Sequence, residues 1–286
     1  KFLGYPYYDI PRIEEWRGFQ DTLSQLQNYK INVTEYNLFD KSTDGLYKNT
    51  WLHTLFLSSM TDNILNNDLV NMILAHNISG PNGFDAINNN EETHFQKQAT
   101  AFLMMLYIEV SKDMLNTYKL EFPISLTDTI EYANSNDVIS EISCPRMYGW
   151  KYDNNDIETG IITNVTDTSY TISILEAYSD NLLWIHWNVD SLRASIDGYD
   201  SIIRTYQIGK TNIIIPSFSI STCKSVILGD ANEDYVLNIF DIVIIVSHIL
   251  EENTISEKQF IICDINSDNN LNIIDIITLV NSILEP

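Results

Sequence analysis

The sequence predicts an α+β multidomain protein with a mainly helical N-terminal unit, a β-sandwich-like middle unit and a small all-α C-terminal unit. Three observations carry this prediction. Apolar residues recur at helical spacing in the first part of the chain, short runs rich in Ile, Val, Thr and Tyr follow from about residue 142, and a segment near the C-terminus repeats itself. With 286 residues the chain is long enough for two or three domains. We place them at 1–140, 141–225 and 226–286.

The N-terminal unit has five candidate elements. In order, they are a helix at 11–29, a strand at 31–36, a helix capped by Thr50, a short helix at 68–74, and a long helix that is capped by Thr93 and runs from His94 to about Tyr118. Apolar residues of the long helix, among them Phe102 and Leu106, form a wide stripe. A wide stripe indicates a helix that is buried on most sides, so we expect this helix to lie at the centre of its core.

The middle unit has the short runs that are typical of strands. The predicted strands are 157–165, 169–177, 183–189, 201–208 and 212–220. Turn residues such as Asn154 and Gly198 separate them, and short strands at this spacing predict a small β-sandwich. Pro216 would then lie on an edge strand or at a bulge, because proline cannot donate to a sheet hydrogen bond.

The C-terminal unit contains two twelve-residue loops with one pattern of oxygen-bearing residues. Positions 1, 3, 5, 9 and 12 hold Asp or Asn, and position 7 can offer its backbone carbonyl whatever its side chain. The candidate metal ligands are Asp230, Asn232, Asp234, Val236, Asn238 and Asp241 in loop 1, and Asp264, Asn266, Asp268, Asn270, Asn272 and Asp275 in loop 2. Because Ca²⁺ takes about six to eight oxygen ligands, a loop that turns alternate side chains inward suits it. We therefore predict two bound Ca²⁺ ions.

Each loop is followed by the same apolar helical pattern. The repeated stripe consists of Ile242, Ile245, Val246, Ile249 and Leu250 in the first copy, and of Ile276, Leu279, Val280, Ile283 and Leu284 in the second. Two such helices can bury these stripes against each other. Two copies in register are also far more specific than a single loop match would be.

This arrangement resembles the dockerin family, in a type I-like form, over residues 229–286. No helical pattern precedes Asp230, whereas a full EF-hand would have an entering helix there. The resemblance implies that the ligand roles fall on the twelve residues named above and that the module docks or tethers the chain. It implies a cohesin-like or other extracellular protein as the partner, and the chain's own β-rich domain is the alternative docking surface.

Two pairs of positions depart from the family's pattern. Position 6, usually Gly, is Tyr235 in loop 1 and Asn269 in loop 2. Asn tolerates a left-handed backbone better than Tyr does, so loop 1 is expected to be weaker or differently shaped. Positions 10 and 11, which often carry a Ser/Thr pair in cellulosomal dockerins, are the apolar pairs 239–240 and 273–274.

Charge and hydropathy limit the partners and the location. The net charge is −23, from 39 acidic and 16 basic residues, which disfavours nucleic acid and anionic membranes. The most apolar run, 99–110, is too short to span a membrane and contains Glu109. Because the chain opens at Lys1, removal of a secretory signal is expected. We predict a secreted protein that is extracellular or attached to the cell surface.

Outside the loops the candidate sites are weaker. His76, Asp85, Glu91, Glu92 and His94 could form a metal or acid–base site, but they have no specific spacing and also suit a solvated loop. His53 is predicted to be a core histidine. Trp184 and Trp187 could each stack a sugar ring, but their parity places them on opposite faces of a strand, so core packing is favoured.

The three cysteines leave one alternative open. Cys144 and Cys223 flank the β-rich segment and either form a disulfide or remain buried thiols. A Cys144–His186 nucleophile pair has no local peptidase signature, and no catalytic residue is assigned.

The sequence therefore favours a secreted or surface-attached modular protein whose C-terminal module binds two Ca²⁺ ions and mediates docking. One alternative is a secreted hydrolase of polysaccharide or protein that carries this module as an appendage, by analogy with other dockerin-bearing chains. Another is a structural or adhesive extracellular protein that assembles with itself. A deep cleft with converging carboxylates or histidines would favour the hydrolase.

Overall fold

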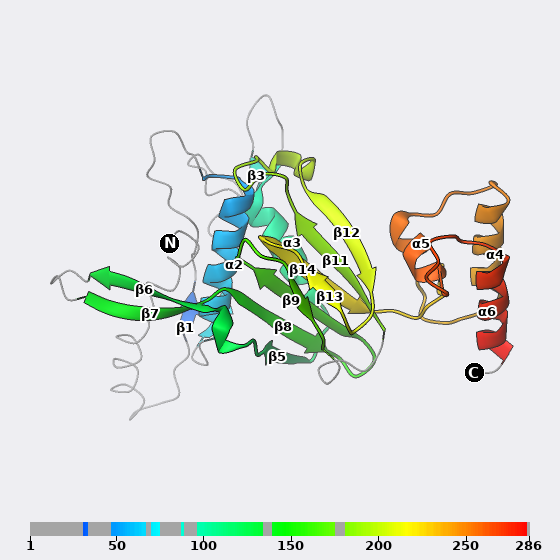
Figure 1. The fold of residues 1–286 in the computed structure, drawn as a ribbon, viewed down its shortest axis with the longest axis horizontal. Coiled ribbons are helices and arrows are strands. Elements are labelled where there is room, and N and C mark those ends of the chain that lie inside the picture. The colour runs from blue at the N-terminus through cyan, green and yellow to red at the C-terminus, as the bar shows by residue number, and fades with distance from the viewer. Residues whose placement is uncertain are drawn as a thin grey trace.

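A computed structural model describes residues 31–33, 47–66, 70–74, 87–88, 96–133, 139–174 and 181–284 of the chain. Among these residues, no helix has the length and apolar character that crossing a membrane requires. The predicted helix at 11–29 lies outside the described residues. Figure 1 shows a large body of sheet and helices, followed by a small cluster of helices at one end of the molecule.

The described elements mix helices and strands. The helices are α2 (Trp51–Leu65), α3 (Ala99–Ser111), α4 (Ile239–Ile249), α5 (Glu257–Cys263) and α6 (Ile273–Leu284), with 3₁₀ turns η2 (Ile124–Leu126) and η3 (Asp197–Tyr199). The strands are β1 (Ile31–Val33), β2 (Val70–Ile73), β3 (Ile87–Asn88), β4 (Gln96–Lys97), β5 (Asn116–Leu120), β6 (Thr127–Ala133), β7 (Ile139–Pro145), β8 (Met147–Asp153), β9 (Glu158–Asn164), β10 (Tyr170–Ile172), β11 (Leu182–Asn188), β12 (Ile203–Ile208), β13 (Ile213–Ile215) and β14 (Ser219–Ser225).

The body is built on a six-stranded antiparallel sheet. Its strand order is β12-β11-β14-β9-β8-β5, so the chain leaves and re-enters the sheet several times. Pro216, predicted to lie on an edge strand or at a bulge, lies instead between β13 and β14, where its missing N–H interrupts no sheet hydrogen bond. Four two-stranded pairs accompany the main sheet among the described residues: β1–β2, β3–β4, β6–β7 and β10–β13.

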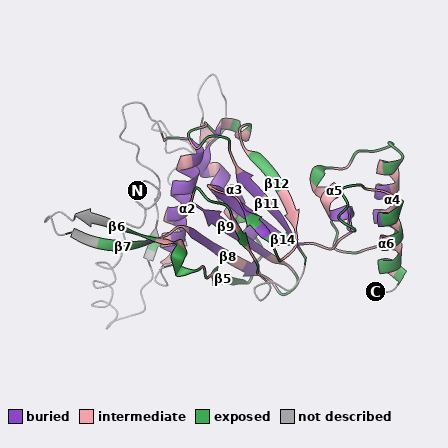
Figure 2. Cartoon of the chain, viewed as in Figure 1, coloured by how far each residue is buried: buried purple, intermediate pink, exposed green. Residues whose placement is uncertain are grey.

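Helices α2 and α3 cover one face of this sheet, and the two helices and the sheet share one core. Trp51 from α2, Phe102 from α3 and Tyr148 from β8 are all fully or nearly fully buried. Figure 2 shows buried residues along α2, α3 and the strands of the sheet. The ring of Phe102 lies 5.8 Å from that of Trp51 and 5.5 Å from that of Trp187 on β11. The predicted N-terminal helices thus pack directly on strands of the predicted middle unit.

The opposite face of the sheet has its own apolar cluster. Trp184, Ile162 and Met147 are buried there, together with Ile213 and Ile215 from the short β13 strand. The β10–β13 pair therefore contributes to a second layer over this face. The architecture is α+β, with helices and a six-stranded antiparallel sheet in the body and further helices at the C-terminus.

Two helix predictions in the N-terminal unit are wrong in extent or type. The segment predicted as a helix at 68–74 contains strand β2, which pairs in parallel with β1. The long helix starts at Ala99 and ends at Ser111, and Asp113 then takes a left-handed backbone with φ 62°. The chain turns there into β5, whose Tyr118 pairs with Lys151 of β8.

The predicted Thr50 cap is confirmed, because its side chain accepts a hydrogen bond from the His53 N–H.

All three cysteines are buried thiols, and the described residues contain no disulfide bond. Cys144 lies in β7, which pairs with β6, whereas Cys223 lies in β14 within the main sheet. Burial raises the pKa of Cys144 to about 11. A thiol with so high a pKa is protonated at neutral pH, so it does not suit the role of a nucleophile.

The C-terminal helices have a separate small core. Ala231, Ile245, Cys263 and Leu279 are buried together, with none of the body's core residues among them. Gly229 marks the entry to this core. Its φ is 91°, and a Cβ there would lie 2.7 Å from the Leu279 Cδ1, so only glycine fits without a shift.

Candidate metal centres

Loop 1 is held together by hydrogen bonds from its own backbone to its carboxylates. The Asp230 oxygens accept from the N–H groups of Asp234 (3.1 Å) and Tyr235 (2.8 Å). The Asp241 oxygens accept from the N–H groups of Ala231 (2.9 Å), Asn232 (3.3 Å) and Asn238 (2.9 Å). The first and last candidate ligands therefore tie the two ends of the loop to each other.

Loop 2 repeats this pattern bond for bond. Asp264 accepts from the N–H groups of Asp268 (3.1 Å) and Asn269 (2.8 Å). Asp275 accepts from those of Ile265 (3.1 Å), Asn266 (3.4 Å) and Asn272 (2.9 Å). The sequence repeat is thus also a repeat of local geometry.

The remaining candidate ligands are close together in each loop. In loop 1, the Asn232 Nδ2 donates to the Asp234 carboxylate at 2.9 Å, and the Asn238 Nδ2 donates to the Val236 carbonyl at 3.0 Å. The equivalent bonds in loop 2 run from Asn266 to Asp268 (3.0 Å) and from Asn272 to Asn270 (2.9 Å). Each of these acceptor oxygens keeps a second lone pair that a cation could use.

Positions 9 and 12 also begin the helices. Asn238 caps α4 by accepting from the Phe240 N–H at 2.8 Å, and Asp241 completes a reciprocal capping box. Asn272 accepts from the Ile274 N–H in the same way at the start of α6. The residues predicted to hold the ions therefore also fix where each helix starts, which links loop geometry to helix packing.

The donor set of each loop fits a hard cation. Asp241 and Asp275 are fully buried, and Asp230 and Asp264 are nearly so. Burial raises the pKa of Asp230 above its ordinary value, and the nearby charges of Asp241 and Asp234 add to the rise. Within the described ranges no three His, Cys, Asp or Glu side chains alone form a metal-sized cluster. Calcium sites instead mix carboxylate, amide and carbonyl oxygens, which are the groups present here.

Position 6 takes the expected left-handed backbone in both loops. Tyr235 has φ 65° and Asn269 has φ 63°, and the residues at position 4, Glu233 and Ser267, are also left-handed. The two loops therefore share a backbone path, although tyrosine is an unfavourable residue at such an angle.

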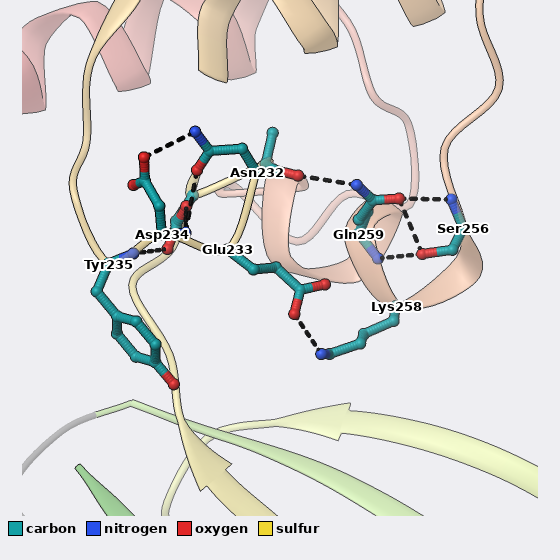
Figure 3. A network of polar contacts seen from close by, with 9 residues as sticks. Asn232, Glu233, Asp234, Tyr235, Ser256, Lys258 and Gln259 are labelled. Carbon is teal, nitrogen blue, oxygen red and sulfur yellow. Dashed lines mark hydrogen bonds and ion pairs between the residues drawn. The ribbon is translucent and has the colours of Figure 1, made fainter. Parts of the chain in front are cut away.

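The short helix α5, which lies between the two loops, supports loop 1. The Gln259 Nε2 of α5 donates to the Ala231 carbonyl at 2.8 Å, and the Lys258 Nζ contacts the Glu233 carboxylate at 2.5 Å (Figure 3). Ser256 and Gln259 form the capping box that starts α5. That Ser-x-x-Gln pattern was the signal in the sequence that could have revealed this helix.

Loop 1 also contacts the body. The Lys224 Nζ of β14 lies 5.2 Å from the centroid of the Tyr235 ring, and α5 contacts β12. Lys224 and Tyr235 line a small cavity of about 70 Å³ together with Glu109 and Val110 of α3. Residues of the body and of loop 1 therefore meet around this cavity.

The other candidate residues are structural where the structure describes them. His53 is buried and its Nδ1 accepts from the Asn49 N–H at 3.1 Å, which confirms a core histidine. Trp184 and Trp187 lie in the cores on opposite faces of the sheet, as their parity predicted. His76, Asp85, Glu91, Glu92 and His94 lie outside the described residues.

His186 is a buried residue of strand β11, whereas Cys144 lies in β7, which pairs with β6. Its Nδ1 lies 2.8 Å from the Ser221 Oγ, and burial lowers its pKa to about 4, although a contact with Gln207 works in the opposite direction. The imidazole is therefore neutral at physiological pH.

Solved structures show where the fold of the body recurs. The GH51 alpha-L-arabinofuranosidase from Thermotoga petrophila RKU-1 is 13% identical with a TM-score of 0.60, over 78% of this chain and 49% of that chain. The alpha-L-arabinofuranosidase from Thermotoga maritima in complex with arabinose is 12% identical with a TM-score of 0.56, over 78% and 48%. This chain thus spans about half the length of those proteins, and at such identity the likeness concerns the fold alone.

Sequence comparisons identify the C-terminal module. A search of curated proteins found no match to the chain. The profile of the dockerin type I domain matches residues 228–284, which contain both loops and α4 to α6. Dockerin domains typically bind calcium, imply a cohesin partner and occur in extracellular or cellulosomal proteins. Residues 228–284 are a dockerin type I domain.

Proposed function

We propose that this chain is an extracellular, cohesin-docked protein whose dockerin module holds one Ca²⁺ ion in loop 1 and one in loop 2. The twelve residues predicted from the sequence would supply the oxygen ligands, and the bound ions would offset the repulsion among the carboxylates. The observation that carries the proposal is the repeat of the same hydrogen bonds in both loops. The module would tether the body to the partner.

The division of the chain is part of the same proposal. The separate core of Ala231, Ile245, Cys263 and Leu279 supports a boundary near residue 226. The core shared by α2, α3 and the sheet favours treating the described residues before that boundary as one body. The apolar cluster between the main sheet and the β10–β13 pair supports a sandwich-like arrangement on that face of the sheet.

The proposal is tested by measuring cohesin binding with and without calcium. The full chain is titrated with a purified type I cohesin by calorimetry, in calcium and then in excess chelator. We expect binding in calcium only, and the variant with Asp241→Ala and Asp275→Ala should bind at least about 100-fold more weakly, because each change removes a buried ligand. Asp167→Ala, an exposed aspartate of the body, is the matched control and should bind normally. Equal binding in calcium and in chelator would contradict the proposal.

A second docking surface is the chain's own body, and the contact between Lys224 and Tyr235 favours it. Because the Tyr235 N–H donates to the Asp230 carboxylate, the same residue belongs to loop 1 and to the contact with the body. In this proposal the module binds cohesin and also rests on the end of the sheet through Tyr235. The contact would limit the angles that the module can take relative to the body.

Tyr235→Asn is expected to loosen this contact without weakening loop 1, because asparagine occupies the equivalent position 269 with the same backbone angle. An exposed cation–π contact contributes about 0.5–1 kcal/mol, so thermolysin should cut the connection at 226–229 roughly two to five times faster. Lys224→Gln removes the same contact from the other side and should give the same increase. Unchanged cleavage in both variants would show that the body does not restrain the module.

The hydrolase alternative rests on the shared fold with arabinofuranosidases, and a fold by itself does not establish an activity. We therefore assign no catalytic residue in the body.

A further inference from the structure

An open groove lies beside the second apolar layer of the body. Its volume is about 730 Å³, which falls within the range of about 300–1,000 Å³ for sites that bind ligands. Residues 119–123, at the end of β5 and beyond it, form one wall, and residues 171–174, in β10 and just after it, form the other. The described lining includes no residue of β13, so the groove lies on the side of β10 that faces away from β13.

The groove is apolar where it meets the core. Ile162 of β9 lines it and is fully buried. Phe122 from one wall and Ile172 from the other are partly buried and pack against the same cluster as Ile162. These side chains therefore keep apolar surface that an occupant of the groove could cover, and covering it would favour binding.

The β10 wall presents an unpaired strand edge. Among the described strands, β10 pairs with β13 alone. The Ile174 N–H donates to the Lys210 carbonyl, just before β13, at 2.9 Å. Because the backbone groups of successive residues in a strand point to opposite sides, those of Thr171 and Ser173 point away from β13 and towards the groove. This edge carries neither a charge nor a proline, which are devices that protect strand edges from pairing.

The opposite wall adds a pattern of charge. Lys119 and Glu121 are exposed and lie two residues apart, so in an extended segment they share one face, while Leu120 and Phe122 share the other. Within the described part of the chain, neither Lys119 nor Glu121 joins an ion pair. An occupant with one acid and one base at alternate positions would therefore complement this wall.

We propose that the groove binds an extended peptide segment of another protein, which adds a strand to the free edge of β10. The peptide backbone bonds to the N–H and C=O groups of Thr171 and Ser173. Aliphatic side chains at alternate positions of the peptide enter the groove over Ile162, and the side chains between them face Lys119 and Glu121. Main-chain hydrogen bonds then supply affinity and the alternate side chains supply specificity. The dockerin module takes no part in this binding.

The charge of the chain argues against a second copy as the occupant. Each chain has a net charge of −23, so two copies repel each other. A short peptide with one acid and one base carries no such penalty. We therefore commit to a peptide segment of a different protein.

The probe is the fluorescein-labelled peptide Thr-Ile-Asp-Val-Lys-Ile-Thr, titrated with the full chain in calcium by fluorescence anisotropy. A second peptide exchanges the Asp and the Lys. Two further peptides carry N-methyl groups on alternate amides, one along each edge of the extended backbone. The chain should bind the first two peptides saturably. At least one N-methylated peptide should bind about tenfold or more weakly, because it loses the hydrogen bonds to β10 while keeping every side chain.

Thr171→Pro tests the same edge from the protein. It removes an N–H that faces the groove and leaves the pairing with β13 intact, so peptide binding should fall about tenfold. Thr171→Val keeps the N–H, is the matched control and should bind normally. Urea unfolding followed by tryptophan fluorescence checks that both variants fold. If Thr171→Pro does not fold, Lys119→Glu with Glu121→Lys replaces it and should reverse the preference between the two charge orders, about twofold to fivefold each way.

Several outcomes would overturn the proposal. They are no binding of either unmethylated peptide, equal binding of all four peptides, and unchanged binding by a folded Thr171→Pro variant. If the replacement pair is used, an unchanged preference between the charge orders counts in the same way. If sedimentation shows a dimer of the full chain that Thr171→Pro or the replacement pair abolishes, a second copy occupies the groove and the proposal is wrong. Cohesin binding is independent of all these results.

Discussion

Removing calcium from the full chain is expected to unfold residues 228–284 and to leave the body folded. Asp230, Asp241, Asp264 and Asp275 are buried carboxylates, and each loop adds a third acid at position 5. Without a cation these charges repel one another at close range. At free calcium about 1,000 times the dissociation constant, each ion contributes about 4 kcal/mol to stability. Loss of two such contributions exceeds what a core as small as that of the module can supply.

The two parts can be followed separately in the intact chain. All five tryptophans lie before residue 228, so tryptophan fluorescence reports the body alone. Helices α4, α5 and α6 contribute to circular dichroism at 222 nm, and a fall in that signal on chelation reports the module. We expect the dichroism to fall, the tryptophan spectrum to stay unchanged, and calcium to restore the signal.

The paired variant with Asp241→Ala and Asp275→Ala should resemble the chelated protein even in calcium. Asp167→Ala changes the same side chain in an exposed position of the body and should respond to chelation like the unchanged chain. If the module keeps its helices after calcium removal, the two loops do not hold structural ions, and the ligand assignment is wrong.

The loops could be predicted because their geometry is local. The carboxylates of Asp230 and Asp264 accept hydrogen bonds from N–H groups four and five residues later, so the spacing in the sequence nearly determines the structure. The left-handed backbone at Tyr235 and Asn269 follows from the same turn. Helix α5 was missed because it is short, and its capping box at Ser256 is a weaker signal than an apolar stripe.

The sheet could be predicted only in part because strand pairing is not local. Strands β9 and β11 have clear β-rich runs, whereas β5 overlaps the end of the long helix that the sequence predicts to about Tyr118. Its place is determined by β8, more than thirty residues later, through pairs such as Tyr118 with Lys151. A run of residues cannot indicate a partner that lies so far along the chain.

The contacts between elements could not be predicted from the sequence for a similar reason. The stripe of α3 indicated that the helix is buried, but not that it lies against the sheet beside Trp187. Likewise, Tyr235 stood out as an unusual residue at position 6, while its contact with Lys224 depends on how the module meets the body. A sequence pattern shows which face of an element is buried, and the fold supplies what covers it.

Trp51→Ala is expected to destabilise the whole body, because Trp51 joins α2 to the sheet. Its side chain is fully buried, its Nε1 donates to the Phe218 carbonyl at 2.7 Å, and its ring contacts Phe102 of α3. Replacing a buried tryptophan by alanine costs about 3–5 kcal/mol, here with the Phe218 carbonyl also left without this donor. For a body of this size the melting temperature should fall by roughly 10 °C.

This substitution also decides how the body is divided. If residues 1–140 folded separately from the β-rich segment, Trp51→Ala would lower one transition and leave a second, carried by Trp184 and Trp187, unchanged. A shared core instead requires one transition that shifts as a unit, because the residues around Trp51 include sheet residues such as Tyr148 and Ile220. Urea unfolding followed by the remaining tryptophans, in calcium, distinguishes the two. Leu115→Ala, which truncates an exposed apolar side chain, should change stability by less than about 0.5 kcal/mol and serves as the control.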